Sequence, residues 1–354
     1  MSHQNPRSWL KTTTLVLAVG ILLIGTPLAA SWASDGPEER RPPAIGPWDT
    51  FSVSEVYAPE DGFYTYAPSV VRDGNTDWIW TCHNDTFRVV KDHIYLTRVV
   101  DDVVIESRSV LEASPAPAWD SFHVCDPSVV AGKFAYQGDK YKLAMFYLGN
   151  DLDASAHNQI GVAFANDPAG PWVKLPKPVV TSDRIDQWGV GQPTAVVMPN
   201  DSPLRPPVLM STAGLTGTDG EADYLNGFDL AFDKRHQRFL TVREQHPYPD
   251  DNPWWIGPAV QVDTIAKRDL LTGRGTWTPV GDINHALTGH PRNHNAGLVR
   301  DWSGYLPDAE SMSVVFTTSC ASLPTIDDQD WSQATCDSLY SYDLWSVEGQ
   351  LKQQ

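Results

Sequence analysis

The sequence predicts an all-β protein, and three observations lead to this prediction. Long stretches with helical periodicity are almost absent beyond the N-terminal region. Short runs rich in Val, Ile, Tyr, Phe and Trp recur instead, and examples read DWIWTCH, HIYLTRVV, VVIESRSVL, YKLAMFYLG and IGVAFA. Gly, Pro, Asn or Asp separates each run from the next. Runs of this length and composition between turn residues indicate β-strands.

The N-terminal region has the features of an export signal. Arg7 and Lys11 precede an apolar run from Thr14 to Ala30, and the small residues of LAASWAS follow. A basic segment, an apolar core and a small-residue exit are typical of a secretory signal peptide. We therefore expect residues 1–33 to be a signal peptide and the mature protein to be secreted into an extracellular compartment. An uncleaved N-terminal membrane anchor is the alternative.

Composition limits the partners of the mature chain. Residues 34–49 are charged and rich in proline, which predicts a linker, and residues 50–354 would form the folded domain. The whole chain has a formal net charge of -18, and an acidic surface repels phosphate backbones and anionic lipids. We expect no nucleic-acid partner, no membrane partner beyond the anchor, and a monomer. A neutral polymer is easier for such a surface to approach.

The four cysteines predict disulfides. An even number of cysteines in an exported chain favours pairing. Cys320 and Cys336 enclose a short polar segment and are expected to pair with each other. A Cys82–Cys125 bond then follows by elimination. A zinc site is not expected, because the cysteines lack the close paired spacing that zinc sites use.

The starts of several strands repeat at a nearly constant interval. Short strands follow a proline in YTYAPSVV, HVCDPSVV, GVGQPTAVV and WIGPAVQV, and NHNAGLVRD has the same shape without one. The prolines Pro68, Pro127, Pro193 and Pro258 lie 59, 66 and 65 residues apart. A repeat of this length holds four strands with their loops, and about five repeats fit the chain. The prediction is a five-bladed β-propeller with four-stranded antiparallel blades around a central axial pocket.

The residue before each proline is expected to face that pocket. These residues are Ala67, Asp126, Gln192 and Gly257, and Asn295 holds the matching place in the fifth repeat. Because the innermost strands of a propeller crowd the axis, their starts would converge on one depression. Asp126 would contribute a carboxylate to it, and Gln192 and Asn295 would contribute amides. An Asp before a Pro is also common in turns, so a strand cap is the alternative for Asp126.

Other polar and aromatic residues accompany these positions. His123 and Asp120 precede Asp126 on the same loop, and an imidazole that titrates near neutrality can move protons. The further candidates for holding sugar hydroxyls or stacking on a sugar ring are His83, Asn84, Asp85, Trp188, Arg292 and His294. For each of them an ordinary turn, loop or core position is the alternative. We expect no cofactor, and a structural calcium ion at the pocket floor, held through water near His294, is the alternative.

Several stretches resemble one group of enzymes. CDPSVV, YKLAMFYLG and NQIGVAFANDPAGPW resemble the second blade of the five-bladed propeller glycosidases related to glycoside hydrolase family 43. HNAGLVRDWSGYL resembles their fifth blade, where a histidine lies at the pocket floor. The resemblance covers most of residues 50–347. It implies a hydrolase that cleaves O-glycosidic bonds in a polysaccharide or oligosaccharide with inversion.

The catalytic positions depart from that family's pattern. Three carboxylates act together in the family, and the resemblance assigns the one that orients the acid and adjusts its pKa to Asp126. The positions of the base and of the acid hold Ala67 and Gln192, which can neither activate water nor protonate a leaving oxygen. Similarity to propeller glycosidases of the anhydro-galactosidase type implies a histidine acid, and His123 is the candidate.

The base is open between two residues. Asp61 lies just before the first strand start, and Asp85 follows the strand DWIWT. Either Asp126 or Asp120 would raise the pKa of a nearby His123. The sequence thus predicts an exported glycoside hydrolase with Asp126, His123 and Asp61 as catalytic residues. A non-catalytic carbohydrate-binding propeller is the alternative, and it explains the missing carboxylates directly.

Overall fold

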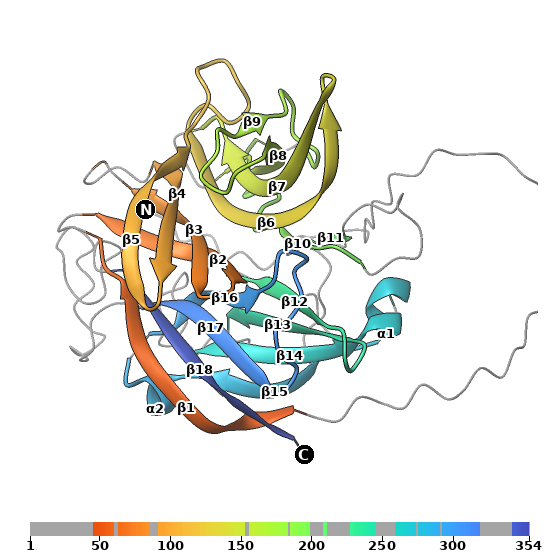
Figure 1. The fold of residues 1–354 in the computed structure, drawn as a ribbon. Coiled ribbons are helices and arrows are strands. Elements are labelled where there is room, and N and C mark those ends of the chain that lie inside the picture. The colour runs from red at the N-terminus through yellow and green to blue at the C-terminus, as the bar shows by residue number, and fades with distance from the viewer. Residues whose placement is uncertain are drawn as a thin grey trace, which may run out of the picture.

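The computed structural model describes most of the chain after the predicted signal peptide. The described residues are 45–59, 63–84, 86, 91–152, 156–182, 185–198, 208–210, 227–244, 259–273, 275–290, 292–318 and 342–353. They form strands β1 to β18 and two short helices (Figure 1), so the all-β prediction is confirmed. No helix within these ranges has the length and apolar character needed to cross a membrane.

One large sheet contains both ends of the described chain. Its order is β1-β18-β17-β16-β2-β3-β4-β5. The bounds are β1 Ile45–Tyr57, β2 Tyr64–Asp73, β3 Thr76–Asn84, β4 Asp92–Val100, β5 Val103–Leu111, β16 His294–Arg300, β17 Ser311–Thr318 and β18 Asp343–Gln353. All neighbours are antiparallel except β16 and β2, which run parallel. The sheet is thus two antiparallel groups of four strands, joined side by side. Strand β1 begins inside the segment predicted as a linker and pairs with β18 (Figure 1).

The other strands form three smaller sheets. The bounds are β6 His123–Tyr136, β7 Asp139–Asn150, β8 Gln159–Ala165, β9 Val173–Lys174, β10 Thr194–Val196, β11 Val208–Met210, β12 Asp229–Asp233, β13 Arg238–Glu244, β14 Val260–Ala266 and β15 Thr278–Ile283. Strands β6 to β9, β10 with β11, and β12 to β15 are neighbours in chain order. Helix α1 (Lys267–Thr272) follows β14 in the chain and contacts it, and helix α2 (His285–Thr288) follows β15.

The innermost strand of each group lies near the centre of the molecule. Strand β2 contacts β6, β6 contacts β10, β10 contacts β12, β12 contacts β16, and β16 pairs with β2 (Figure 1). These contacts form a closed cycle. Strands that are far apart in the sequence are therefore arranged around a common axis.

One kind of hydrogen bond repeats around this cycle. A side chain on one inner strand accepts the backbone N–H of the next inner strand. The pairs are Val129 to Ser69 Oγ (3.3 Å), Ala195 to Ser128 Oγ (3.0 Å), Leu230 to Thr194 Oγ1 (3.2 Å) and Leu298 to Asp229 Oδ2 (2.9 Å). The parallel pairing of Val299 with Val70 closes the cycle. We name Ser69, Ser128, Thr194 and Asp229 the ring acceptors.

A residue with positive φ lies two positions before each ring acceptor. The residues are Ala67 (51°), Asp126 (46°), Gln192 (51°) and Gly227 (63°), and Asn295 (43°) holds the matching position on β16. Ladder pairing shifts register just here in β2, β6 and β16, which marks β-bulges. Bulges re-aim side chains. The backbone at these five positions therefore differs from that of the strands that follow.

The fourth strand start corrects one prediction. Strand β14, which follows residue 258, is paired on both sides, by β13 and β15, and is not the first strand of its sheet. That strand is β12, and Gly227 takes the place predicted for Gly257. A Cβ at Gly227 would lie 2.5 Å from Asn295 Oδ1. The prediction relied on proline, which occurs at the start of many kinds of strand. The position of Gly227 instead requires a positive φ and close packing, and both favour glycine.

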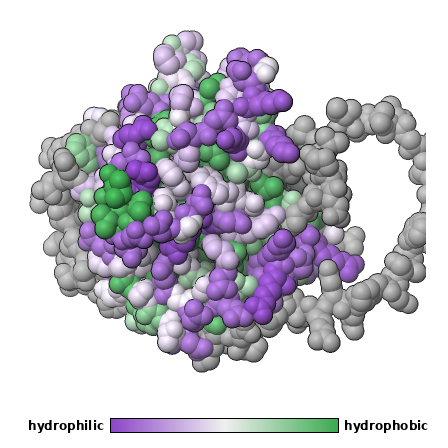
Figure 2. Space-filling view, in the orientation of Figure 1, coloured by the Kyte–Doolittle hydropathy of each residue, from purple (hydrophilic) through white to green (hydrophobic). Residues whose placement is uncertain are grey.

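The end of the axis opposite the strand starts is covered by the loop after β16. Backbone carbonyls of Trp302, Ser303 and Gly304 accept the N–H groups of Ala131 (2.7 Å), Val197 (2.8 Å) and Phe232 (3.0 Å). Apolar clusters fill the spaces between neighbouring sheets. Exposed apolar side chains gather on β5, at Val103, Val104 and Ile105, where Figure 2 shows a hydrophobic patch on an otherwise largely hydrophilic face.

Candidate functional site

The starts of the inner strands surround a cavity on the axis. Its described lining is Ala67, Pro68, Asp126, Pro127, Gln192, Pro193, Gly227, Phe228, Asp229, Asn295 and Ala296. All five positive-φ residues are in this set, because the bulges bring their side chains or backbone to the axis. The structure therefore brings together Asp126, Gln192 and Asn295, as expected from the sequence.

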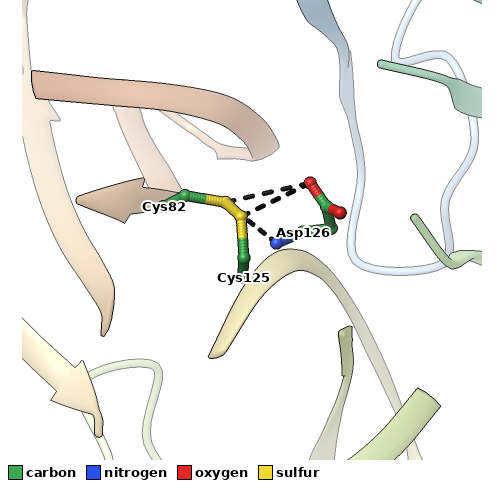
Figure 3. Close-up of side chains that lie close together, drawn as sticks. All are labelled: Cys82, Cys125 and Asp126. Carbon is green, nitrogen blue, oxygen red and sulfur yellow. Dashed lines mark hydrogen bonds between the residues drawn. A yellow bond between two sulfur atoms is a disulfide. The ribbon is translucent and has the colours of Figure 1, made fainter. Parts of the chain in front are cut away.

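Asp126 lies against a disulfide bond. The Cys82–Cys125 bond predicted by elimination is present, with an S–S distance of 2.02 Å. Asp126 Oδ1 lies 3.8 Å from Cys82 Sγ and 3.6 Å from Cys125 Sγ (Figure 3). The other predicted pairing, Cys320–Cys336, concerns residues outside the described ranges.

The Asp126 carboxyl is an acid with an unusual pKa. Burial, and then the negative charge of Asp92, raise its pKa from 3.8 to about 7, while a hydrogen bond from the backbone N–H of Gln192 acts in the opposite direction. A carboxyl with such a pKa carries a proton for much of the time at neutral pH. Asp126 can therefore donate a proton to a group bound in the cavity.

Asp92 is a buried carboxylate that sequence reasoning missed. Tyr64 Oη donates to its Oδ1 (2.6 Å) and Tyr66 Oη donates to its Oδ2 (2.7 Å). Asn84 Nδ2 donates to Tyr64 Oη (3.0 Å). In the sequence Asp92 is one acid before a strand, which looks like a turn residue. The tyrosine hydroxyls that identify it come from another strand.

His123 lies beside Asp92 and is not among the described residues that line the cavity. Its Nδ1 accepts the backbone N–H of Asp92 (3.1 Å) and lies 3.7 Å from Asp92 Oδ2. Burial lowers the pKa of His123, against the attraction of Asp92. The neutral imidazole therefore carries its proton on Nε2.

Asp120 forms a buried ion pair away from the cavity lining. Its Oδ2 accepts from Lys174 Nζ (2.7 Å) and from Tyr147 Oη (3.0 Å). Burial lowers the pKa of Lys174, and Asp120 opposes that effect. This pairing holds β9 against the loop before β6.

The pair His83 and Asn84 is buried at the end of β3. The His83 ring stacks on Tyr95 with centroids 3.9 Å apart. Asn84 Oδ1 accepts the backbone N–H of Thr86 (2.7 Å). Neither belongs to the described cavity lining. Asp61 and Asp85, the two candidate bases, lie outside the described residues.

Next to Asn295, at the start of β16, His294 is fully buried. Its Nδ1 accepts from Asn295 Nδ2 (3.1 Å), and its ring packs edge-on against Tyr342. Burial, and then the positive charge of Arg292, lower the pKa of His294 to about 3. The imidazole is therefore neutral, with its proton on Nε2. Arg292 is itself buried, and its carbonyl accepts from Thr318 Oγ1 (2.6 Å).

A calcium ion held through water near His294 stays the alternative expected from the sequence. Calcium takes six to eight oxygen ligands. A protonated Nε2 donates hydrogen bonds and cannot ligate a cation. Among the described residues, the clusters of acids, cysteines and histidines close enough to hold a metal do not include His294. We therefore derive no step through a metal ion.

Glu244 is a second buried carboxylate that sequence reasoning missed. It ends β13, and its Oε1 accepts the backbone N–H of Asn295 (3.2 Å) and lies 3.9 Å from His294 Nδ1. The hydrogen bond fixes the backbone of the cavity-lining Asn295. In the sequence Glu244 simply ends a strand run, and nothing local indicates its partner 51 residues away.

Trp188 packs beside Gly191, which precedes the cavity-lining Gln192. Its side chain is 40% exposed, and a Cβ at Gly191 would lie 2.9 Å from its Cη2 atom. An exposed indole close to a polar cavity offers an apolar platform for a sugar ring. The cavity-lining Asp229 forms an ion pair with Arg300 (3.1 Å) and accepts a hydrogen bond from Thr194 Oγ1 (2.8 Å). Its carboxylate is therefore bound by protein groups.

The sequence matches no protein-family model and no curated protein sequence. It is similar in structure to Zg3597, a family 117 glycoside hydrolase produced by the marine bacterium Zobellia galactanivorans. The two share 12% identity with a TM-score of 0.54, over 87% of this protein and 90% of that one. BT0996, in a complex with RGII, gives 12% identity and a TM-score of 0.50, over 86% and 92%.

A third similar structure is the GH43_1 enzyme from Xanthomonas citri complexed with xylotriose. It shares 12% identity with a TM-score of 0.49, over 85% of this protein and 93% of that one. At this identity the likeness concerns the fold. The protein has a fold of the kind found in Zg3597, a family 117 glycoside hydrolase, so the resemblance to propeller glycosidases is confirmed at the level of the fold.

Proposed function

We propose that this protein is an exported glycoside hydrolase that acts in the axial cavity of a five-bladed propeller, with Asp126 as its general acid. The cycle of inner strands β2, β6, β10, β12 and β16 supports the count of five blades. One observation carries the catalytic proposal. Asp126 lines the cavity and has a pKa of about 7, so a proton is available there at neutral pH.

The reaction needs two proton transfers. Asp126 gives its proton to the glycosidic oxygen as the bond from that oxygen to the anomeric carbon breaks. Water adds to the anomeric carbon, and a base takes its proton, so the products are a hemiacetal sugar and an alcohol. We keep Asp61 as the proposed base, with Asp85 as the alternative. Carboxyl groups about 6.5–9.5 Å apart would leave room for that water and give inversion.

The other residues near Asp126 take supporting roles in this proposal. His123 was predicted as the acid; its Nδ1 accepts the Asp92 backbone N–H, and it is not among the described residues that line the cavity, so we give the acid role to Asp126. Gln192 and Asn295 offer amide groups to sugar hydroxyls, and Trp188 offers an exposed ring. A polysaccharide or oligosaccharide end is the substrate that suits these groups.

A carbohydrate-binding protein without catalysis is the second candidate. Ala67 and Gln192 occupy two positions where the related glycosidases carry carboxylates, and this observation favours it. Binding needs hydroxyl partners and a ring platform, and it does not need a second carboxylate.

A paired screen distinguishes these two functions. Arabinan, xylan, galactan and mannan panels are incubated with the wild type, with Asp126→Asn and with Asp139→Asn, which changes an exposed carboxyl in the β6–β7 hairpin. We expect Asp126→Asn to lower the hydrolysis rate by about 10²-fold or more while sugar binding changes little, and Asp139→Asn to match the wild type. Sugar binding by the wild type without any turnover would support the binding protein, and neither binding nor turnover would contradict both.

A further inference from the structure

We infer that the Cys82–Cys125 disulfide, backed by Asp92, is a donor-free wall that keeps Asp126 in its proton-bearing form. Because this role matters for catalysis only if Asp126 is the acid, its functional meaning rests on the proposed function. The disulfide thus acts as a positioning element in addition to its role as a cross-link between β3 and β6.

The geometry places both sulfur atoms directly against the acid. Cys82 and Cys125 are buried, and the backbone N–H of Asp126 points at Cys82 Sγ (2.9 Å). Asp126 Oδ1 lies within 3.8 Å of both sulfurs (Figure 3). A thiol or a hydroxyl at this place could donate a hydrogen bond, but a disulfide sulfur carries no hydrogen. Asp126 Oδ1 is therefore next to two atoms that cannot donate a hydrogen bond to its negative charge.

Donors facing a carboxyl decide how readily it ionises. A carboxylate that accepts two or three N–H bonds holds its charge well, whereas a carboxyl in apolar surroundings keeps its proton. Asp126 accepts the backbone N–H of Gln192 on one side. Its Oδ1 also lies against the two sulfurs. A carboxylate oxygen of Asp92 lies within 4.8 Å of Cys125 Sγ, and the negative charge of Asp92 acts on Asp126. The balance favours the neutral acid.

Among the residues that the structure describes, the other polar groups near Asp126 do not offset this balance. The hydroxyls of Tyr64 and Tyr66 on β2 are directed at Asp92. His123 on β6 is neutral because burial lowers its pKa. Asp229 on β12 lines the same cavity, but Arg300 on β16 pairs with it.

Two double variants separate the donor effect from the loss of the cross-link. Cys82→Ala/Cys125→Ala and Cys82→Ser/Cys125→Ser both remove the disulfide, and only the serine pair places hydroxyl donors beside Asp126. The ionisation of Asp126 is followed by carbon-13 NMR of the folded protein labelled at the aspartate carboxyls, with the resonance assigned through Asp126→Asn. We expect the alanine pair to titrate near the wild type and the serine pair to titrate at least about one pH unit lower. Equal titration of the two pairs would overturn the inference.

A variant with an intact disulfide tests the second part of the wall. Asp92→Asn keeps the side-chain shape, removes the charge behind the sulfurs, and is expected to lower the titration midpoint of Asp126. Circular dichroism checks that each variant is folded. If the cysteine variants do not fold, an unchanged Asp126 midpoint in Asp92→Asn overturns the inference. The titration does not require catalytic turnover. A protein without hydrolase activity that shows the expected changes in the Asp126 titration midpoint would therefore refute the proposed function and support the inference about the disulfide.

Discussion

Arg300 is the residue whose loss should damage the ring of inner strands most. It is fully buried at the end of β16. Its Nη1 donates to Leu230 O (2.9 Å) and Ala195 O (3.3 Å) and pairs with Asp229 Oδ1 (3.1 Å), while Nη2 donates to Ser69 Oγ (3.2 Å). Arg300→Met keeps an unbranched apolar stem and removes the guanidinium. One substitution thus removes contacts to three other inner strands.

The size of the effect follows from what is left behind. Removing one partner of a buried ion pair costs about 3–5 kcal/mol, because the other charge stays in the interior unpaired. Each buried neutral acceptor left without a donor adds about 1–3 kcal/mol. Domains are stable by about 5–15 kcal/mol, so we expect Arg300→Met to lose at least about 3 kcal/mol, a large part of the total.

The test is urea unfolding followed by tryptophan fluorescence. Asp229→Asn, added to Arg300→Met, should restore part of the loss because no unpaired charge remains. Burial already raises the pKa of Asp229 against the effect of Arg300, and removing Arg300 raises that pKa further. The deficit of the single variant should therefore shrink as the pH falls, because protonated Asp229 has no charge to leave unpaired. A loss of stability below about 1 kcal/mol would refute this reasoning. So would a loss that changes neither when Asp229→Asn is added nor when the pH is lowered.

Three other tests concern the cavity itself. Gly227→Ala should destabilise the protein by about 1–3 kcal/mol in the same unfolding assay. Gly227 has a positive φ, which alanine adopts at a cost, and the added Cβ would lie 2.5 Å from Asn295 Oδ1. An unchanged unfolding midpoint would contradict this prediction. The hydrolysis rate should fall as the pH rises through about 7, because the pKa of Asp126 is raised to that value and the acid loses its proton above it, and a rate that rises there would exclude this acid. Trp188→Ala should weaken sugar binding measured by calorimetry without moving the unfolding midpoint, and unaltered binding would remove the platform.

Local signals in the sequence identified most of the cavity. Proline after Ala67, Asp126 and Gln192 marks strands that can lose one ladder hydrogen bond, and the nearly constant spacing indicates a repeat. Asn295 was found by the likeness of its strand alone. The residues that line a cavity built from repeated strand starts can therefore be predicted before the fold is known.

Residues whose role depends on partners far away in the sequence could not be predicted. Gly227 lacks the proline signal and is recognisable only by its φ of 63° and its contact with Asn295. Asp92 and Glu244 each look like an acid at a strand end. Their burial depends on tyrosine hydroxyls and on a backbone N–H from other strands, and no local pattern encodes such contacts.

The positive-φ residues at the cavity and the ring acceptors, which hold the inner strands together, are different sets, and each acceptor lies two positions after its positive-φ residue. Ser69, Ser128, Thr194 and Asp229 hold the inner strands together, and all of them can accept a hydrogen bond. The positions two residues earlier are Ala, Asp, Gln and Gly, which share no chemical function and share only a positive φ. Because the ring does not use the side chains of these earlier residues, carboxylates can be replaced there without loss of the fold. The fold therefore neither requires nor excludes a carboxylate at Ala67 and Gln192, and whether the cavity is catalytic depends on Asp126, which the hydrolysis assay of Asp126→Asn tests.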